Sequence, residues 1–480
     1  MIDTTTLTID AIHTHLKSGN FTIQELVDAY TDNINNRNTT LNVYLEIFND
    51  IDQQVKYAER MFKDGTATLL TGIPIALKDN MLFKGHKVSA GSKMLEHYVA
   101  TYDAGVVKQL QKQGAIILGR ANMDEFAMGS STETSAFGIT RNPVNEDYVP
   151  GGTSGGSAAA VAMNGAVVSL GSDTGGSIRQ PASFTGVVGL KPTYGAVSRS
   201  GIISMASSLD QVGPMGKSVR DVEILYHAIN GYDAHDSTSV PLALRSSEAP
   251  LKKRLGIPRS FLTGDGIDKE VLENFAISCA KLKEEGYVLV DVSLPLIKYS
   301  LAVYYIVMPA EVSSNLARYD GMRYGLSSPA ETLYDVYAKT RGQGFGKEVR
   351  RRILLGTYIL SHGYHDAYYN KAVTVREAIK QELENVFKDV DALITPTVPF
   401  PPFKFGEKSK DPLAMYMSDI FTVPANITGI PAISIPSGFT YDGLPLGLHI
   451  MAPHFREDIL FTIGKAFENT MENKYNKLHG

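Results

Sequence analysis

The first 65 residues show the spacing of amphipathic helices. Apolar side chains recur at Ile9, Ile12 and Leu16, and the same intervals continue through residues 22–36. Steps of three and four residues bring such side chains onto one face of a helix. The pattern therefore predicts an N-terminal helical segment over residues 1–65 that packs through its apolar face.

Residues 66–232 change to a different pattern, in which short apolar runs alternate with helical spacing. The runs at 73–77, 115–119 and 166–170 are short and continuous, as expected for strands that are buried on both faces. A helical pattern at 104–113 lies between the first two runs. This alternation is typical of an α/β fold.

The second half of the chain continues the alternation around one long helical section. Residues 297–386 have helical spacing and many tyrosines, and we expect them to form a cap over a cleft. Strand patterns return at 392–397, 432–436 and 446–451. No shift in composition marks a boundary, so the pattern predicts one α/β domain over residues 1–480.

The composition is that of a globular chain: of 480 residues, 43% are hydrophobic and 20% are charged. The formal net charge of −5 gives the chain as a whole no electrostatic attraction for nucleic acid. The one cysteine, Cys279, excludes an internal disulfide and fits a reducing compartment. Neither a basic leader nor an apolar stretch of membrane-spanning length occurs, so we expect a cytoplasmic protein without a membrane contact.

The stretch 150–192 contains glycines and hydroxyl side chains more densely than any other part of the sequence. Its first glycines permit close backbone approach, and the alanine-rich run after them favours a helix. The second glycine turn ends on Ser177, which we interpret as a nucleophile. The N–H groups of Thr174, Gly175 and Gly176 are then expected to face a developing oxyanion.

A serine needs a base to attack an amide at neutral pH, and residues 150–192 contain no histidine. Lys78 directly follows the apolar run 73–77, where loss of hydration favours the neutral amine and makes it a usable base. One hydroxyl between Lys78 and Ser177 would complete a proton relay.

Taken one at a time, these features have simpler explanations. A Gly/Ser-rich segment is commonly a flexible loop, and a lysine after a strand is commonly a solvated charge. The apolar runs within residues 150–192 argue against a linker. A phosphate-binding loop would need a Gly-x-x-x-x-Gly-Lys-Ser/Thr pattern, which this stretch lacks.

Together these residues resemble the amidase signature family, whose Gly/Ser-rich core carries a Ser–cis-Ser–Lys triad. The resemblance assigns Ser177 as the acyl-accepting nucleophile, Lys78 as the base and Thr153, on a cis peptide bond, as the hydroxyl bridge. Threonine stands where the family usually has serine, and it adds a methyl group on a restricted χ1. Ser154 is the alternative bridge. The resemblance also implies the amidase signature fold, a single large domain whose central mixed β-sheet is covered by helices on both faces.

Within that family, the chain resembles the glutaminase subunits of tRNA-dependent amidotransferases. The resemblance implies that Tyr304, Arg352 and Asp419 hold free glutamine. An arginine pairs with the α-carboxylate through two hydrogen bonds, and an aspartate accepts hydrogen bonds from the α-ammonium. Each residue also has a structural explanation: a core tyrosine, a charge on the solvated helix face of the run 350–352, and a charge at a helix end.

The same resemblance places the loop 123–134 against the cleft. Its residues Met128, Gly129 and Ser130 are then expected to contact the substrate. A capped surface loop explains any one of these residues nearly as well.

The chemistry that the resemblance implies is acyl transfer: Ser177 attacks the glutamine carboxamide, ammonia leaves, and water hydrolyses the glutamyl-enzyme to glutamate. It also implies a heterotrimer, in which a B subunit uses ATP and Mg²⁺ to convert Glu-tRNA(Gln) to Gln-tRNA(Gln) and a small C subunit clasps the two. Neither a cofactor nor a metal is expected in this chain, although His362, His365, Asp366 and Glu348 lie near one another in sequence. Whether Asp-tRNA(Asn) is also a substrate depends on the partner.

Two alternative functions stay open at this point. A free-standing amidase would act on another small amide, since the core motif specifies an amide bond and little more. A non-catalytic scaffold that kept the fold is the second alternative, because Thr153 departs from the usual triad.

Overall fold

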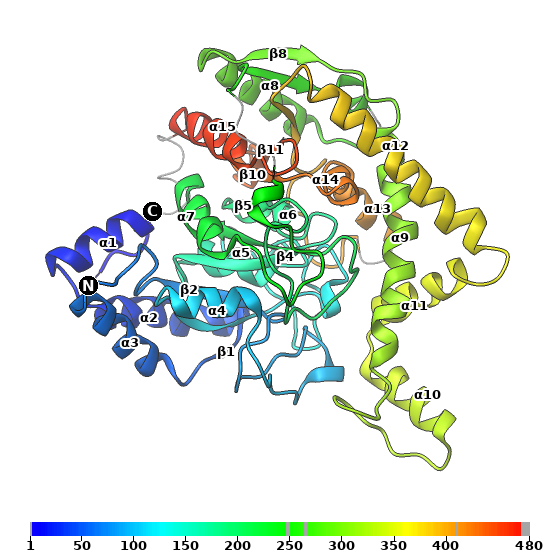
Figure 1. Cartoon of the computed structure of the whole chain (residues 1–480), viewed down its shortest axis with the longest axis horizontal. Coiled ribbons are helices and arrows are strands. Elements are labelled where there is room, and N and C mark those ends of the chain that lie inside the picture. The colour runs from blue at the N-terminus through cyan, green and yellow to red at the C-terminus, as the bar shows by residue number, and fades with distance from the viewer. Residues whose placement is uncertain (1, 246–249, 264–265, 409–410, 472–480) are drawn as a thin grey trace.

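The computed structural model describes residues 2–245, 250–263, 266–408 and 411–471, which contain an eleven-stranded sheet surrounded by helices (Figure 1). In sheet order the strands are β1 (Tyr44–Ile47), β3 (Ile116–Ala121), β2 (Pro74–Lys78), β4 (Val168–Asp173), β6 (Gln211–Gly216), β5 (Val188–Lys191), β10 (Ala432–Phe439), β11 (Pro445–Met451), β9 (Ala392–Pro396), β7 (Arg254–Ile257) and β8 (Val288–Asp291).

The helices, in chain order, are α1 (Ile9–Ser18), α2 (Ile23–Leu41), α3 (Ile51–Lys63), α4 (Gly105–Lys112), α5 (Gly155–Ala162), α6 (Arg179–Thr185), α7 (Val219–Ile229), α8 (Lys269–Glu284), α9 (Ser300–Asn315), α10 (Leu333–Gly344), α11 (Lys347–Ile359), α12 (Lys371–Val386), α13 (Pro412–Tyr416), α14 (Val423–Thr428) and α15 (Glu457–Asn469). None of the helices in the described part of the chain combines the length and the hydropathy that a membrane crossing requires.

The sheet contains both parallel and antiparallel pairs. β2 runs parallel to β3 and to β4, with Ile75 beside Val168. β10 instead pairs antiparallel with β5 and β11. Every residue of β2, β3 and β4 is buried, as their continuous apolar runs predict. The expected α/β domain with a central mixed sheet is confirmed.

Helices cover both faces of this sheet, as the alternation of side chains in β10 and β11 shows. Ile435 of β10 points at α15, where a Cβ added to Gly464 would lie 2.9 Å from Ile435 Cδ1. His449 of β11 pairs with Ser434, the preceding residue of β10, and contacts Arg179 of α6. Successive residues of a strand point to opposite faces, so α15 and α6 lie on opposite sides of the sheet.

Residues 1–65 are not entirely helical, which corrects the prediction from spacing. β1 lies between α2 and α3 and pairs antiparallel with β3 at the edge of the sheet, with Ile47 beside Gly119. Asn42 ends α2 in the left-handed region, at φ 51°, and the chain extends after it. A four-residue strand is too short to show a clear alternation, so only its pairing with β3 defines it.

Residues 297–386 form α9 to α12, which lie on the right-hand side of Figure 1. α9 and α11 approach each other closely, since a Cβ added to Gly356 of α11 would lie 1.8 Å from the carbonyl oxygen of Pro309 in α9. Only glycine permits two backbones to come this near. α9 carries Tyr304 and α11 carries Arg352, so this contact sets the distance between the two side chains.

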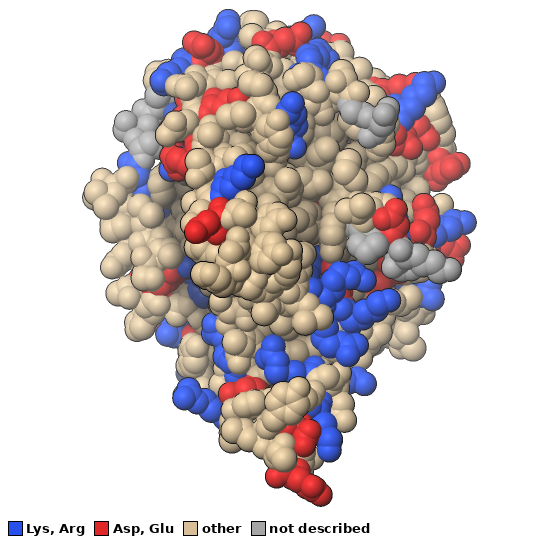
Figure 2. All heavy atoms as spheres, turned by 90° about the vertical axis from the view of Figure 1, so that its right-hand side faces the viewer, with Lys and Arg blue, Asp and Glu red and all other residues tan. Residues whose placement is uncertain are grey.

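Figure 2 turns the side with α9 to α12 toward the viewer. Lys and Arg side chains gather in the middle and lower part of this face. The chain as a whole has a formal net charge of −5, so this local excess of cations is produced by the fold and not by the composition. A positive field on this face favours the approach of anionic groups.

Candidate active site

Lys78 is the last residue of β2, and its side chain is fully buried. Its Nζ donates hydrogen bonds to Thr153 Oγ1 at 2.6 Å, Ser154 Oγ at 2.8 Å and Ser172 Oγ at 2.8 Å. Because β2 and β4 are parallel neighbours, their carboxyl ends bring Lys78 and Ser172 to the same edge of the sheet.

Burial lowers the pKa of the Lys78 amine to about 7, although the carboxylates of Asp124, Asp173 and Asp210 oppose part of the change. The hydrogen-bond acceptors around Nζ among the described residues are hydroxyls and the Ser172 carbonyl, which carry no charge. At neutral pH about half of these amines are free bases, which suits proton abstraction.

The Gly152–Thr153 peptide bond is cis, and Thr153 is fully buried. Thr153 Oγ1 is hydrogen-bonded to Lys78 Nζ and to no other group in the described part of the chain. Ser154 Oγ instead donates to the Ser172 carbonyl at 3.0 Å and is held against β4. The structure thus contains the link between Lys78 and Thr153, whose hydroxyl keeps further hydrogen-bonding capacity.

Ser177 lies in the turn between β4 and α6, and 9% of its surface is exposed. Its carbonyl accepts the N–H of Ser154 at 3.1 Å, which ties the two glycine turns together. Ser177 Oγ makes no hydrogen bond to any described residue, so the predicted link from Thr153 to Ser177 is not closed in this structure. The hydroxyl is accessible to a substrate.

The N–H groups expected to face an oxyanion fall into two sets. Gly176 donates its N–H to Asp173 Oδ1 at 2.9 Å and is already engaged. The N–H groups of Thr174, Gly175 and Ser177 have no hydrogen-bond partner within the described ranges. Free N–H donors beside a nucleophile are what an oxyanion hole requires. The amide of Ser177 itself is a donor that the sequence pattern did not indicate.

The carboxylate of Asp173 fixes this turn. It accepts the Ile178 N–H at 3.1 Å and pairs with Arg179 Nη2 at 2.9 Å. Arg179 is itself fully buried and also contacts Asn426 Oδ1 at 2.6 Å and His449 Nε2 at 2.9 Å. Burial alone would raise the pKa of Asp173, but Arg179 and Asn426 outweigh it and hold that pKa well below its usual range. The turn therefore rests on a permanent charge pair, which the sequence pattern did not predict.

The three residues expected to hold a substrate come from α9, α11 and the turn before α14, and the structure brings them together. Tyr304 lies against the nucleophile turn, since a Cβ added to Gly175 would be 2.6 Å from its Oη. Asp419 Oδ2 accepts the Tyr305 hydroxyl at 2.8 Å. The guanidinium carbon of Arg352 lies 5.9 Å from the centre of the Tyr305 ring. Tyr305 thus separates a buried cation from a buried anion.

Arg352 is 4% exposed, whereas Leu354, two residues later, is 70% exposed. Arg352 therefore belongs to the buried face of α11, and the solvated-face explanation for the run 350–352 does not apply to it. Its Nε donates to Glu348 Oε1 at 2.8 Å, and the Tyr416 hydroxyl donates to the same oxygen at 3.3 Å. Neither Glu348 nor Tyr416 was expected as a partner here. The four-residue spacing of Glu348 and Arg352 was the available signal.

Burial raises the pKa of the Asp419 carboxyl to about 7, and the Tyr305 hydrogen bond and the Arg352 charge offset only part of the rise. A buried carboxyl that loses its charge this easily gains most from a cation placed beside it. A substrate ammonium group would be such a cation.

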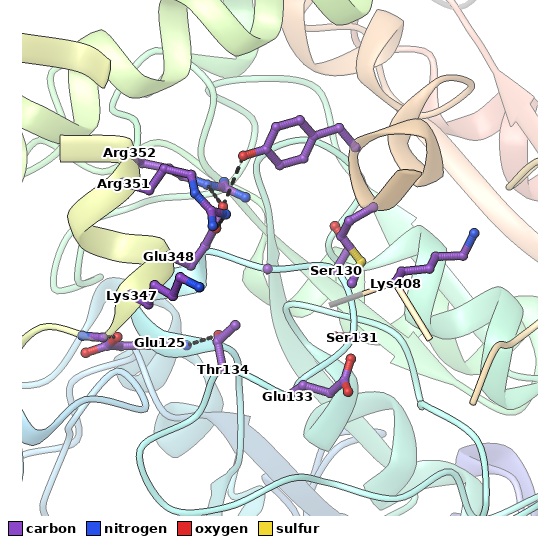
Figure 3. Close-up of a pocket in the computed structure, with 14 residues that line it drawn as sticks. Glu125, Ser130, Ser131, Glu133, Thr134, Lys347, Glu348, Arg351, Arg352 and Lys408 are labelled. Carbon is purple, nitrogen blue, oxygen red and sulfur yellow. Dashed lines mark hydrogen bonds and ion pairs between the residues drawn. The ribbon is translucent and has the colours of Figure 1, made fainter. Parts of the chain in front are cut away.

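A cavity of about 270 Å³ opens beside these groups (Figure 3). It is lined by Glu125, Gly129, Ser130, Ser131, Glu133, Thr134, Gly346, Lys347, Glu348, Arg351, Arg352, Lys408, Met415 and Tyr416. The predicted residues Gly129, Ser130 and Arg352 are therefore on its wall. Met128 is fully buried and does not line it, so a direct contact of its side chain with a ligand in this cavity is not supported.

Lys78 and Ser177 lie outside this lining, but the cavity wall is continuous with their surroundings. A Cβ added to Gly152, the neighbour of Thr153, would lie 2.5 Å from the backbone nitrogen of Ser131. The loop that forms one wall of the cavity thus packs directly on the cis peptide bond. Within the described ranges, no three His, Cys, Asp or Glu side chains gather as metal ligands would.

Comparison with known proteins agrees with this geometry. Residues 25–461 match the family model described as Amidase. The A subunit of the glutamyl-tRNA(Gln) amidotransferase of Thermoanaerobacter pseudethanolicus is 49% identical over 477 residues, covering 98% of this chain and 97% of that protein. The protein of the same name from Clostridium botulinum (strain Okra / Type B1) is 47% identical over 481 residues, covering 98% of each.

Solved structures give the same result. The A subunit of the glutamyl-tRNA(Gln) amidotransferase of Thermotoga maritima is 40% identical with a TM-score of 0.80, and the match covers 98% of this chain and 96% of that one. The peptide amidase from Stenotrophomonas maltophilia is 28% identical with a TM-score of 0.80, over 97% of each chain. The chain, with its Gly/Ser-rich core and its buried lysine, therefore belongs to the amidase family.

Proposed function

We propose that this chain is the glutaminase subunit of a tRNA-dependent amidotransferase and releases ammonia from free glutamine. One observation carries the proposal: Arg352 and Asp419, a buried cation and a buried carboxyl on either side of Tyr305, lie beside the turn that holds Ser177. This arrangement suits a zwitterionic amino acid with an amide in its side chain.

In the proposed reaction, Ser177 Oγ attacks the glutamine carboxamide carbon. Its proton passes through Thr153 Oγ1 to the neutral Lys78 amine, and the oxyanion is stabilised by the free N–H groups of the turn. Lys78 returns the proton to the leaving nitrogen, which departs as ammonia when the C–N bond breaks. Water then attacks the glutamyl ester by the same route, giving glutamate and free Ser177.

Substrate orientation follows from the two buried charges. Arg352 uses its Nε for Glu348, and its terminal NH groups make no hydrogen bond to an oxygen among the described residues, so they are available for the α-carboxylate. Asp419 would receive the α-ammonium. The lysines and arginines at the cavity, Lys347, Arg351 and Lys408, add attraction for the carboxylate.

The partners in the proposal follow the names of the relatives. The ammonia would pass to a B subunit, which would use ATP and Mg²⁺ to convert Glu-tRNA(Gln) to Gln-tRNA(Gln), with a C subunit clasping the two. This chain would itself need no cofactor, and its place would be the cytoplasm, where its single cysteine stays reduced. A free-standing amidase is less well supported, because the two amidotransferase relatives are 49% and 47% identical and the peptide amidase is 28% identical.

Co-expression of the chain with candidate B and C subunits tests the proposal. Ammonia release from glutamine and formation of Gln-tRNA are measured with and without ATP. We expect both products from the wild-type complex and neither from a Ser177→Ala complex. Hydrolysis of varied amides by the isolated chain, without preference for glutamine and without a stable complex, would support the free-standing amidase instead.

A further inference from the structure

Glu125 is a buried carboxyl residue that the reaction above does not use. It begins the turn η2 (Glu125–Ala127) after β3, and only 3% of its surface is exposed. Its Oε1 accepts the Ser92 hydroxyl at 2.6 Å, and its Oε2 accepts the Gly346 N–H at 2.8 Å. The second contact crosses from the sheet to the start of α11.

Gly346 is the N-cap residue of α11, and no side chain of its own caps this helix. In many helices a carboxylate three residues into the first turn accepts the N-cap N–H, and here a residue distant in sequence fills that place. A carboxylate at this end also suits the helix dipole. A Cβ added to Gly346 would lie 2.3 Å from Glu125 Oε2, so glycine is what allows the contact.

Glu125 also belongs to the loop that forms the opposite wall of the cavity. Its N–H donates to Thr134 Oγ1 at 3.1 Å, and Thr134 Oγ1 donates in turn to Asp124 Oδ1 at 2.8 Å. The Phe126 ring packs on Phe345, the residue before Gly346, with ring centres 5.6 Å apart. One residue therefore connects the loop wall to the helix wall.

Arg352 lies six residues beyond Gly346 on α11, which is about 9 Å along the helix axis. Figure 3 shows Glu125 and Arg352 at the same cavity, and Gly346 is part of its lining. Because α11 is also fixed against α9 at Gly356, its two contacts with the rest of the chain determine where the guanidinium points.

We infer that Glu125 is a positioning residue, whose carboxyl fixes the N-terminus of α11 on the loop 124–134 and thereby places Arg352 for the substrate carboxylate. The inference rests on the proposed function, since it takes Arg352 as the group that binds the α-carboxylate of glutamine. It predicts that loss of the carboxyl weakens substrate binding and leaves the chemistry at Ser177 largely unchanged.

Kinetics of the complex with its partner subunits test this. Glu125→Ala is expected to raise KM for glutamine about tenfold or more while kcat changes less than about threefold. Glu125→Gln keeps a carbonyl oxygen for the Gly346 N–H, so its KM should return to within about threefold of wild type. Glu96→Ala, which removes a solvent-exposed carboxylate on the neighbouring turn, should leave both constants unchanged.

Amide hydrogen exchange supplies a readout that does not depend on glutamine. Residues 345–349 should exchange faster in Glu125→Ala than in wild type or Glu96→Ala, because the start of α11 loses its anchor. Failure of wild type to release ammonia would overturn the proposed function, while this exchange measurement would still decide whether the contact holds the helix.

A second variant addresses the same contact from the other side. Gly346→Ala should raise KM in the wild-type background and have a smaller effect in Glu125→Ala, where the clashing carboxyl is gone. Additive effects of the two substitutions would contradict the inference. A KM within about twofold of wild type in Glu125→Ala, or unchanged exchange at 345–349, would also overturn it.

Discussion

At the scale of single residues, Thr153 is the hydroxyl on which the proposed relay depends. Thr153→Ser should keep glutaminase kcat within about tenfold of wild type, a barrier change of about 1.4 kcal/mol, because the hydroxyl stays. Thr153→Val is nearly isosteric without the hydroxyl, and its kcat should fall almost as far as that of Ser177→Ala. Ser154→Ala is the matched comparison: if it loses activity while Thr153→Val keeps most of its rate, Ser154 is the bridge.

Two residues that titrate near pH 7 set the expected pH profile. Burial brings the pKa of Lys78 down to about 7 and the pKa of Asp419 up to about 7. The lysine must be neutral and the aspartate must be charged, so both requirements are met above pH 7 and lost below it. We expect log kcat/KM for glutamine to fall as pH decreases through 7, with a limiting slope that approaches two.

The check on this profile is a variant with one titrating group removed. Asp419→Asn should show a raised KM and a limiting slope near one, since only Lys78 still titrates. A wild-type profile that is flat between about pH 6 and 8 would contradict the assignment of both groups.

Lys78 also makes the stability of the fold depend on pH. Its pKa is about 7 in the folded chain against an ordinary value of 10.5. Between these values the unfolded chain binds a proton that the folded chain does not. The free energy of unfolding therefore rises with pH in this window, by up to about 1.4 kcal/mol per pH unit.

Lys78→Met removes this dependence. The difference in unfolding free energy, variant minus wild type, should decrease as the pH rises from about 7 to 10. Urea unfolding of both proteins at several pH values measures it. A difference that does not change with pH would show that Lys78 stays protonated in the folded chain.

At the scale of helices, the contact of α9 with α11 sets the geometry of the substrate groups. Gly356→Ala places a Cβ 1.8 Å from the Pro309 carbonyl oxygen and should push the helices apart, at a cost of about 1–3 kcal/mol. KM for glutamine should rise as well, because Tyr304 and Arg352 lie on the two helices. Thermal unfolding and steady-state kinetics measure the two effects.

α10 offers the control for this substitution. Gly342 is also helical, but a Cβ there would have no atom within 4 Å. Gly342→Ala should leave KM unchanged and stabilise the chain by about 0.5–1 kcal/mol through helix propensity alone. Equal effects at the two glycines would mean that the close approach of α9 and α11 is not important.

At the scale of the whole molecule, Arg179 joins segments that are distant in sequence. It contacts Asp173, Asn426 and His449 inside the protein. Arg179→Met leaves the Asp173 carboxylate buried without its cation, which should cost about 3–5 kcal/mol of stability and reduce activity through the Ser177 turn.

The matched control is an ion pair on the surface. Arg259 and Asp291 lie 2.9 Å apart, with side chains that are 57% and 71% exposed. Arg259→Met should change stability by about 0–1 kcal/mol, because water already screens that pair. Denaturation of both variants measures the contrast, and similar losses would contradict the role given to Arg179.

Features that depend on neighbouring residues could be predicted from the sequence alone. The apolar runs indicated β2, β3 and β4, and the apolar spacing indicated the helices of the first 65 residues and of residues 297–386. The dense glycines and hydroxyls of residues 150–192 and the lysine after the run 73–77 pointed to amide chemistry. Such signals are readable because strand burial, helix faces and turns are set by residues only a few positions apart.

Features that join distant residues required the folded chain. β1 is a strand because β3 lies beside it, and Gly176 turns its N–H to Asp173 because Arg179 holds that carboxylate. The burial of Arg352 and the contact of Glu125 with Gly346, 221 positions away, likewise appear only after folding. Burial, charge pairing and pKa depend on what surrounds a group in space, and that environment comes from segments whose order along the chain does not show that they meet.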